Sequence, residues 1–137
     1  MSQLQIQASD FQNREFQLRF DNLTSKTILK NWSQCQLVEI DEKHLGFHAP
    51  KGTCADGHSL TVYLREAAPG LSKEALPGEE VLLEMTGKIT EFSRSGDDRV
   101  LVQVELTQFP EKKWKAFLEE LGKLQVQMDK ALKSMRD

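Results

Sequence analysis

The chain has 137 residues, which suits one domain whose core is large enough to be stable without disulfide bonds or a structural metal. Hydrophobic residues make up 39% and charged residues 28% of it, a balance typical of a globular protein. The formal net charge of −3 provides no general attraction to nucleic acid or to an anionic membrane surface. We therefore expect no DNA partner.

Two features of the sequence indicate the cellular compartment of the protein. No apolar run approaches the roughly 20 residues that span a bilayer, and the first ten residues lack the basic start and apolar run of a secretory signal. The two cysteines, Cys35 and Cys54, are too few for a disulfide framework. We expect a cytoplasmic protein with no membrane insertion, in which both thiols are reduced and buried.

Residues 1–25 show the least regular pattern. Two short alternations of apolar residues there fit a helix or a strand equally well. The segment is rich in Gln and Asn, carries Arg14 and Arg19, and suits a part of the chain that packs on a finished domain or moves freely. We interpret it as an amino-terminal arm.

Between residues 26 and 109, alternating apolar residues separated by turn-forming residues predict six short strands. The expected ranges are 26–30, 33–40, 44–49, 58–64, 80–92 and 99–106. Gly87, in the middle of the longest range, indicates a bulge or bend of the kind that small barrels use. The pattern is typical of a mainly β domain built as a six-stranded antiparallel barrel.

Residues 110–137 predict one long helix, because Pro110 suits the first helical position and apolar residues then recur at intervals of three and four. The stripe consists of Trp114, Phe117, Leu121, Leu124, Met128, Ala131 and Met135. At about 1.5 Å per residue the helix is about 40 Å long, which exceeds a small barrel. Either the whole stripe packs on its own domain, or its carboxy-terminal turns form a coiled coil that makes a homodimer or larger assembly.

Metal and catalytic sites are not favoured. His44 and His48 are four residues apart, as are Cys54 and His58, but four residues of a strand span about 13 Å, too far for one ion. The sequence contains no Gly-x-Ser-x-Gly motif and no glycine-rich phosphate loop before a helix. We expect a non-enzyme with neither metal nor cofactor.

The stretch from Val38 to Phe47 is the candidate ligand site, because an acid, a base and a glycine meet there at one strand junction. One strand is expected to arrive at Asp41 and the next to leave near Gly46. A tight turn with a positive-φ glycine would explain Asp41 and Gly46 without any ligand.

This stretch and the order of the strands resemble the PilZ domain, a bacterial barrel that receives the second messenger cyclic di-GMP. The resemblance covers about residues 26–120. It rests on 38–47, on the run 87–92, and on 100–109 followed by 114–118, which look like the last hairpin and helix of the family. It implies a PilZ-like barrel followed by a helix, with cyclic di-GMP as the ligand.

The resemblance also implies a ligand site. In the family, an Asp and a Ser on the barrel surface bind the nucleotide, and two arginines of a preceding arm grip phosphates and stack on guanine. Asp41 and Gly46 fit this spacing, Lys43 stands where the family has Ser, and Arg14 and Arg19 are one residue further apart than the family's pair. These five residues are the candidate ligand-binding residues.

Three functional interpretations follow. In the first, the chain is a PilZ-like signalling module or adaptor with weak or lost nucleotide binding, which acts on an unidentified protein partner. In the second, it is a functional cyclic di-GMP receptor whose arm reorders on binding. In the third, it is an unrelated β-barrel that binds a small ligand or an oligonucleotide.

Overall fold

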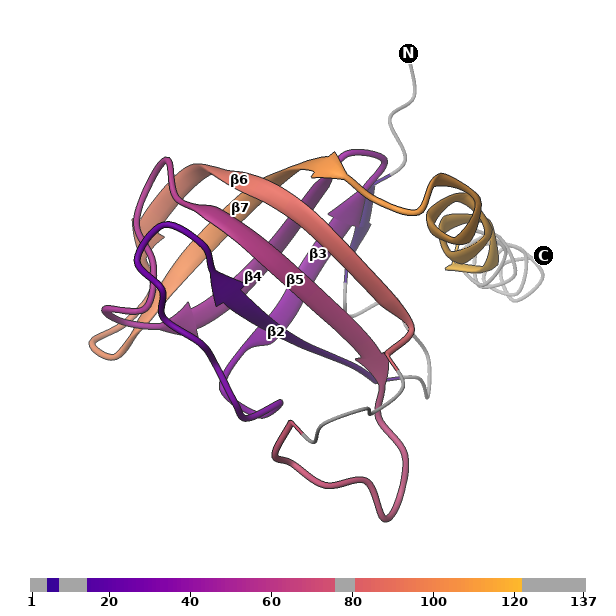
Figure 1. Cartoon of the computed structure of the whole chain (residues 1–137), viewed down its shortest axis with the longest axis horizontal. Coiled ribbons are helices and arrows are strands. Elements are labelled where there is room, and N and C mark those ends of the chain that lie inside the picture. Colours follow the sequence, from indigo (N-terminus) through magenta and orange to yellow (C-terminus); the bar gives the residue numbers. More distant parts are fainter. Residues whose placement is uncertain (1–4, 8–14, 76–80, 122–137) are drawn as a thin grey trace, which may run out of the picture.

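The computed structural model describes residues 5–7, 15–75 and 81–121. Seven strands make one antiparallel sheet: β1 (Gln5–Gln7), β2 (Phe16–Asn22), β3 (Gln36–Asp41), β4 (His44–Pro50), β5 (Ser59–Glu66), β6 (Leu83–Arg94) and β7 (Arg99–Gln108). Their order across the sheet is β1-β3-β4-β7-β6-β5-β2 (Figure 1).

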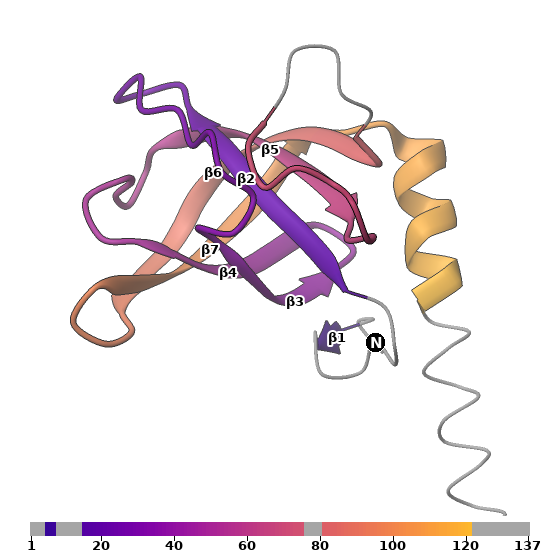
Figure 2. The same ribbon diagram turned by 90° about the horizontal axis from the view of Figure 1, so that it is seen from below.

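Strands β2 to β7 curve into a half-barrel around one apolar core (Figure 2). The strands alternate between buried and less buried positions, as expected for a sheet with one face on a core. The fully buried side chains on them include Leu18, Phe20, Leu45, Phe47, Leu60, Val62, Leu64, Val102 and Val104. Among the described strands, no backbone pairing joins β2 to β3, so the sheet keeps two edges and β1 extends one of them beyond β3.

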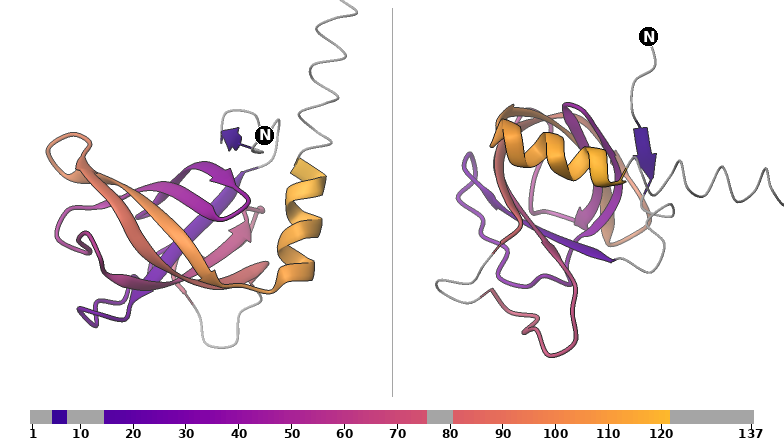
Figure 3. Two further views of the ribbon diagram at one scale, coloured as in Figure 1. Left: turned by 90° about the horizontal axis from the view of Figure 1, so that it is seen from above. Right: turned by 90° about the vertical axis from the view of Figure 1, so that its right-hand side faces the viewer.

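A helix that begins at residue 111 follows β7 and lies across one end of the half-barrel (Figure 3). Trp114, Phe117, Leu118 and Leu121 face the core, and each is at most 7% exposed. The rings of Phe117 and Phe16, at the start of β2, pack edge to face with centroids 5.2 Å apart. The first half of the predicted apolar stripe therefore packs on its own domain, whereas the stripe beyond residue 121 and its predicted dimer seam lie outside the described residues.

The predicted strand at 26–30 is wrong, and the sheet begins earlier, inside the range interpreted as an arm. Strand β2 takes its place and pairs along its whole length with β5, from Phe16 opposite Glu66 to Asn22 opposite Leu60. The segment 26–30 is a loop with a single bridge, in which Ile28 is 57% exposed and Lys26 has a φ of 64°. Phe16, Leu18 and Phe20 supply three buried side chains on one face, which 26–30 cannot match.

The other five predicted strands are present, and two of the three register shifts in the sheet bear on these predictions. One lies between Thr86 and Gly87, which confirms the predicted bulge in the longest strand. The other lies between Leu37 and Glu39 in β3, and it changes the face of the residues that follow. Leu37 and Ile40 are consequently both buried, although strict alternation places them on opposite faces.

No helix in the described part of the chain has the length and apolar character needed to cross a membrane.

Candidate functional site

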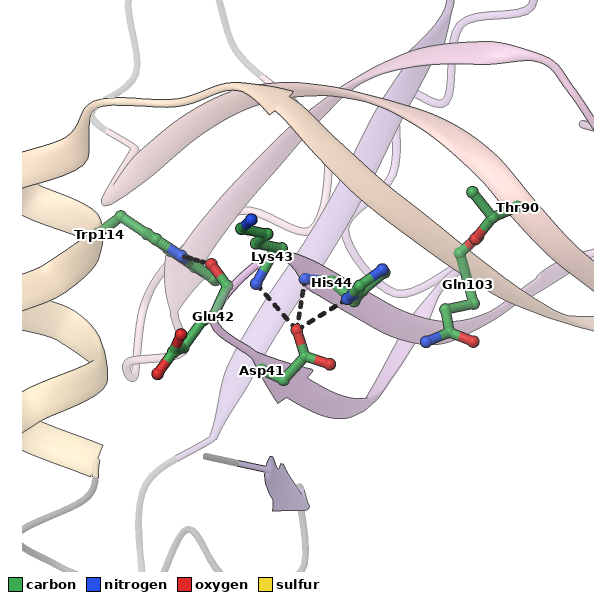
Figure 4. A network of polar contacts seen from close by, with 7 residues as sticks. All are labelled: Asp41, Glu42, Lys43, His44, Thr90, Gln103 and Trp114. Carbon is green, nitrogen blue, oxygen red and sulfur yellow. Dashed lines mark hydrogen bonds and ion pairs between the residues drawn. The ribbon is translucent and has the colours of Figure 1, made fainter. Parts of the chain in front are cut away.

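The turn between β3 and β4 is organised by the carboxylate of Asp41 (Figure 4). Its Oδ1 accepts hydrogen bonds from the backbone N–H groups of Lys43, at 2.8 Å, and His44, at 2.7 Å. The Nδ1 atom of His44 lies 3.0 Å from the same oxygen. Asp41 therefore closes its own turn, and its charge faces the imidazole of His44.

Two further contacts hold the backbone of this turn. The indole Nε1 of Trp114, on the helix, donates to the carbonyl oxygen of Glu42 at 2.9 Å (Figure 4). The backbone N–H of Leu106, in β7, donates to the carbonyl oxygen of Lys43 at 2.7 Å. The turn is thus fixed from the helix and from the sheet, while the side chains of Glu42 and Lys43 are exposed.

Gly46 lies inside β4 and not in the turn. It pairs with Glu39 of β3 and with Gln103 of β7. A Cβ atom added to Gly46 would lie 2.7 Å from Cγ of Glu39, so the Glu39 side chain passes over the glycine. Positive φ is found at Gly52, Gly57, Gly70 and Gly96 among the described glycines. The positive-φ explanation of Gly46 is therefore wrong, and close approach of Glu39 replaces it.

The surface beside Gly46 is a shallow depression of about 420 Å³. Its lining includes Glu39, Asp56, Glu91, Phe92 and Gln103. Three carboxylates around one hollow favour a cation over a phosphate, because negatively charged side chains repel a negatively charged ligand.

Arg19 lies on the outer side of β2 in a cluster with Trp32, Tyr63 and Arg65, which we call the Trp32 cluster. Its guanidinium carbon is 5.0 Å from the centroid of the Trp32 ring and 4.2 Å from that of the Tyr63 ring. Arg65 lies 4.4 Å from the Trp32 centroid on the same outer face. The Trp32 side chain is fully buried, and that of Arg19 is only 13% exposed. The guanidinium of Arg19 is therefore engaged within the protein.

Asp21 connects this cluster by charge and hydrogen bonding. Its Oδ1 is 3.6 Å from Nη1 of Arg19, and its Oδ2 accepts a hydrogen bond of 3.0 Å from the Tyr63 hydroxyl. Burial, together with the hydrogen bond to Asp21, raises the pKa of Tyr63 to about 12. The neutral phenol is the form that this site stabilises.

The structure brings only part of the predicted site together. Asp41 and Lys43 share the turn, Gly46 lies in the next strand, and Arg19 belongs to the Trp32 cluster. Arg14 lies outside the described residues. However, β1 pairs with β3 so that Gln5 is opposite Asp41, which places the backbone of this part of the arm beside the candidate site.

Sequence reasoning missed two functional neighbours, Glu39 and Trp114. Glu39 is at a position where simple alternation suggests the core, and the bulge in β3 carries no separate sequence signal. Trp114 is correctly predicted on the apolar stripe, but nothing in its spacing indicates that its N–H group reaches Glu42. The Asp-x-x-His spacing of Asp41 and His44 was the available signal for a side chain that caps its own turn.

Residues considered for metal binding lie in separate environments. His44 contacts Asp41, whereas Nδ1 of His58 lies 2.9 Å from the side-chain nitrogen of Asn22. Cys35 and Cys54 are both free and buried, as expected. Burial raises the pKa of both thiols, and the neighbouring Cys54 helps to raise that of Cys35 to about 12. Within the described ranges, no group of three or more His, Cys, Asp or Glu side chains is placed to hold a metal ion.

Comparison with known proteins provides a likeness in fold. No family model matches the chain, and no curated protein matches it either. The solved structure of the Bacillus subtilis inhibitor of motility (MotI/DgrA) superimposes with a TM-score of 0.60 at 10% sequence identity. The match covers 93% of this chain and 52% of that protein, so the chain spans about half its length. At this identity the likeness concerns the fold alone, and it supports a PilZ-like fold: antiparallel strands in a half-barrel followed by a helix.

Proposed function

We propose that the chain is a PilZ-like signalling adaptor of the bacterial cytoplasm, in which cyclic di-GMP binding is weak or lost and a protein partner is the main target. The fold supports this assignment, and the structural neighbour is itself named as an inhibitor of motility. The proposed role is binding and not catalysis. Self-association through the carboxy-terminal helix is part of the proposal.

The engagement of Arg19 is the observation that carries the proposal. An arginine that stacks on a guanine base must offer its guanidinium plane to the ligand. Arg19 instead contacts the rings of Trp32 and Tyr63, and its side chain is 13% exposed. Releasing it would break two cation–π contacts, each worth roughly 0.5–2 kcal/mol, before any ligand contact could form.

The β3–β4 junction also supports weak or lost binding of cyclic di-GMP. Oδ1 of Asp41 is occupied by its own turn, and Lys43 replaces the small hydroxyl of the family pattern. The hollow beside Gly46 carries the carboxylates of Glu39 and Glu91, which disfavour a ligand with two phosphates. Both parts of the recognition pattern are therefore altered.

Isothermal titration calorimetry with cyclic di-GMP at low salt tests the proposal. We expect no saturable heat in the micromolar range, with 5′-GMP as the control for nonspecific binding. Saturable micromolar heat with cyclic di-GMP alone would overturn it. The variants Arg14→Ala and Asp41→Asn would then show whether the predicted residues provide the affinity.

A second candidate, a working cyclic di-GMP receptor whose arm reorders on binding, is favoured by one observation. Strand β1 belongs to the arm and pairs with β3 beside Asp41, so that a ligand at Asp41 could displace or order it. Hydrogen exchange of the first 15 residues discriminates the two candidates. Protection that changes on addition of cyclic di-GMP supports the receptor, and unchanged protection supports the adaptor.

A further inference from the structure

A groove runs beside the carboxy-terminal helix, between the helix and the chain that leads into β6, and it is mainly apolar in its larger hollow and more polar in its smaller one. It consists of two adjoining hollows of about 780 and 670 Å³, both lined by Val81, Leu82, Leu83 and Lys113. Leu71 and Ala116 extend the apolar lining of the first hollow. Leu82 is 42% exposed and Leu71 is 49% exposed, so two large apolar side chains face solvent along one groove.

The groove is formed by backbone that the domain already holds in place. The N–H of Leu82 donates to the carbonyl oxygen of Leu64 at 2.8 Å, at the end of β5. Arg65 donates through Nη2 to the carbonyl oxygen of Ser72 at 2.6 Å, which fixes the loop that carries Leu71. A partner would therefore meet a preformed surface, which reduces the entropy lost on binding.

The sequence beyond Leu121 is a suitable occupant. Sixteen residues, 122–137, follow the described helix and continue the three-to-four spacing of its apolar stripe. The stripe in this range consists of Leu124, Met128, Ala131 and Met135, and Leu132 widens it. Four basic residues and two acidic residues accompany it, whereas the charged residues that line the two hollows carry a net charge of −1: Arg65, Lys113, Glu66, Glu84 and Glu120. An amphipathic helix of this kind binds by placing its apolar face in such a groove.

Geometry favours a second copy over the chain's own carboxy terminus. The groove lies alongside helix residues 113–120, which precede the second half of the stripe in residues 122–137. A straight helix advances about 1.5 Å per residue, so a continuous helix would carry Met128 and Met135 away from its own groove. In a two-fold dimer, each copy could place its stripe in the groove of the other.

We propose that this groove receives residues 122–137 of a second copy of the chain. The proposal deepens the self-association proposed above and rests on it, but it does not depend on whether cyclic di-GMP is bound. It differs from a coiled coil in which the two stripes pair with each other, because the stripe of one copy contacts Leu71 and Leu82 of the other.

Light scattering coupled to size exclusion, followed by sedimentation equilibrium on the full chain, tests the groove. We expect a dimer, with the dissociation constant raised roughly tenfold or more by Leu82→Asp and by Met128→Asp, because each change buries a charge in an apolar contact. Leu101→Asp is the matched control, since Leu101 is 38% exposed at the hairpin end of β7, far from the helix, and this variant should remain dimeric. Leu71→Asp provides a second groove variant if Leu82→Asp fails to fold.

The outcomes separate the alternatives. A monomeric wild-type chain overturns the proposal. A dimer that Met128→Asp abolishes but Leu82→Asp and Leu71→Asp leave intact also overturns it and indicates a stripe-to-stripe coiled coil. Calorimetry tests nucleotide binding, whereas the molecular mass of the wild type and its variants tests the groove. Failure of one proposal therefore does not imply failure of the other.

Discussion

The indole nitrogen of Trp114 and the carbonyl oxygen of Glu42 are joined by a hydrogen bond of 2.9 Å, which ties the carboxy-terminal helix to the turn between β3 and β4. The next carbonyl, that of Lys43, accepts from the N–H of Leu106 in β7. Two successive carbonyl groups of the candidate site therefore depend on elements near the end of the chain. A single side chain therefore links the helix to this turn.

Replacing Trp114 with Phe should test this connection. The change removes the N–H donor and also leaves a smaller ring in the core, so we expect the free energy of unfolding, measured with urea, to fall by about 1–3 kcal/mol. Hydrogen exchange should become faster at the amides of Lys43 and His44. Glu42→Ala is the control, because it leaves the backbone carbonyl in place and removes only an exposed side chain. Equal stabilities for all three proteins would contradict the expected role of the bond.

The stability cost of adding a methyl group at Gly46 should depend on the side chain of Glu39. Gly46→Ala would place Cβ 2.7 Å from Cγ of Glu39, so the carboxylate side chain must move, and we expect a destabilisation of about 1–3 kcal/mol. In Glu39→Ala the obstructing atoms are gone, so the same substitution should cost much less. A double-mutant cycle by urea unfolding measures this coupling directly.

Gly87→Ala is the control for that cycle. Its Cβ would clash with Cγ1 of Val104 and lie 2.7 Å from the backbone oxygen of Glu105, neither of which involves Glu39. The substitution should therefore be costly in the presence and in the absence of the Glu39 side chain. If Glu39→Ala relieves neither glycine variant, the close approach at Gly46 does not constrain the site.

The sequence was sufficient to predict most of the sheet because its strands bury alternate side chains. β5 and β7 show this most clearly, with Leu60, Val62 and Leu64 and then Val100 and Val102 on the inner face. Strand β2 had an equally good pattern, but its pairing with β5 is a long-range contact. The apolar residues of β2 form a strand because the edge of β5 is available for pairing. No local sequence pattern indicates that edge.

The candidate site was less predictable than the fold for a related reason. The spacing of Asp41 and Gly46 is visible in the sequence, but the same residues serve a turn and a close strand contact. Arg19 is visible as a cation, whereas its aromatic neighbours Trp32 and Tyr63 are 13 and 44 residues away in the chain. Site chemistry depends on such distant neighbours, which spacing does not reveal.

Tyr63 should report the state of the Trp32 cluster, because it is the only tyrosine in the chain. Its pKa is raised to about 12, mainly by burial and then by the hydrogen bond to Asp21, so absorbance at high pH should titrate near 12 in the folded protein and near the ordinary value of 10 after unfolding. Because the pKa is raised in the folded state, the neutral phenol of Tyr63 contributes fully to the free energy of unfolding below pH 10. This contribution is lost as the pH rises toward 12.

The variant Tyr63→Phe isolates this contribution from the lysines and cysteines that titrate in the same range. Its free energy of unfolding should fall less steeply than that of the wild type between pH 10 and pH 12. Parallel pH profiles for the two proteins would contradict the shifted phenol.

Asp41 is predicted to stabilise the turn even without a ligand, and this determines how any loss of binding should be interpreted. Asp41→Ala removes the acceptor for the N–H groups of Lys43 and His44, so urea unfolding should show a loss of about 1–2 kcal/mol. Asp41→Asn keeps an acceptor oxygen and loses only the charge facing His44, so it should retain most of the stability. Asp97→Ala, at an exposed position of the β6–β7 hairpin, is the control and should be close to wild type.

If Asp41→Ala is as stable as this control, the carboxylate is not needed for the turn and is available to a ligand. If the stabilities follow the predicted order, the role of Asp41 in the turn is sufficient to explain this residue. Only Asp41→Asn can then test contact with a nucleotide, because it leaves the backbone of the turn undisturbed.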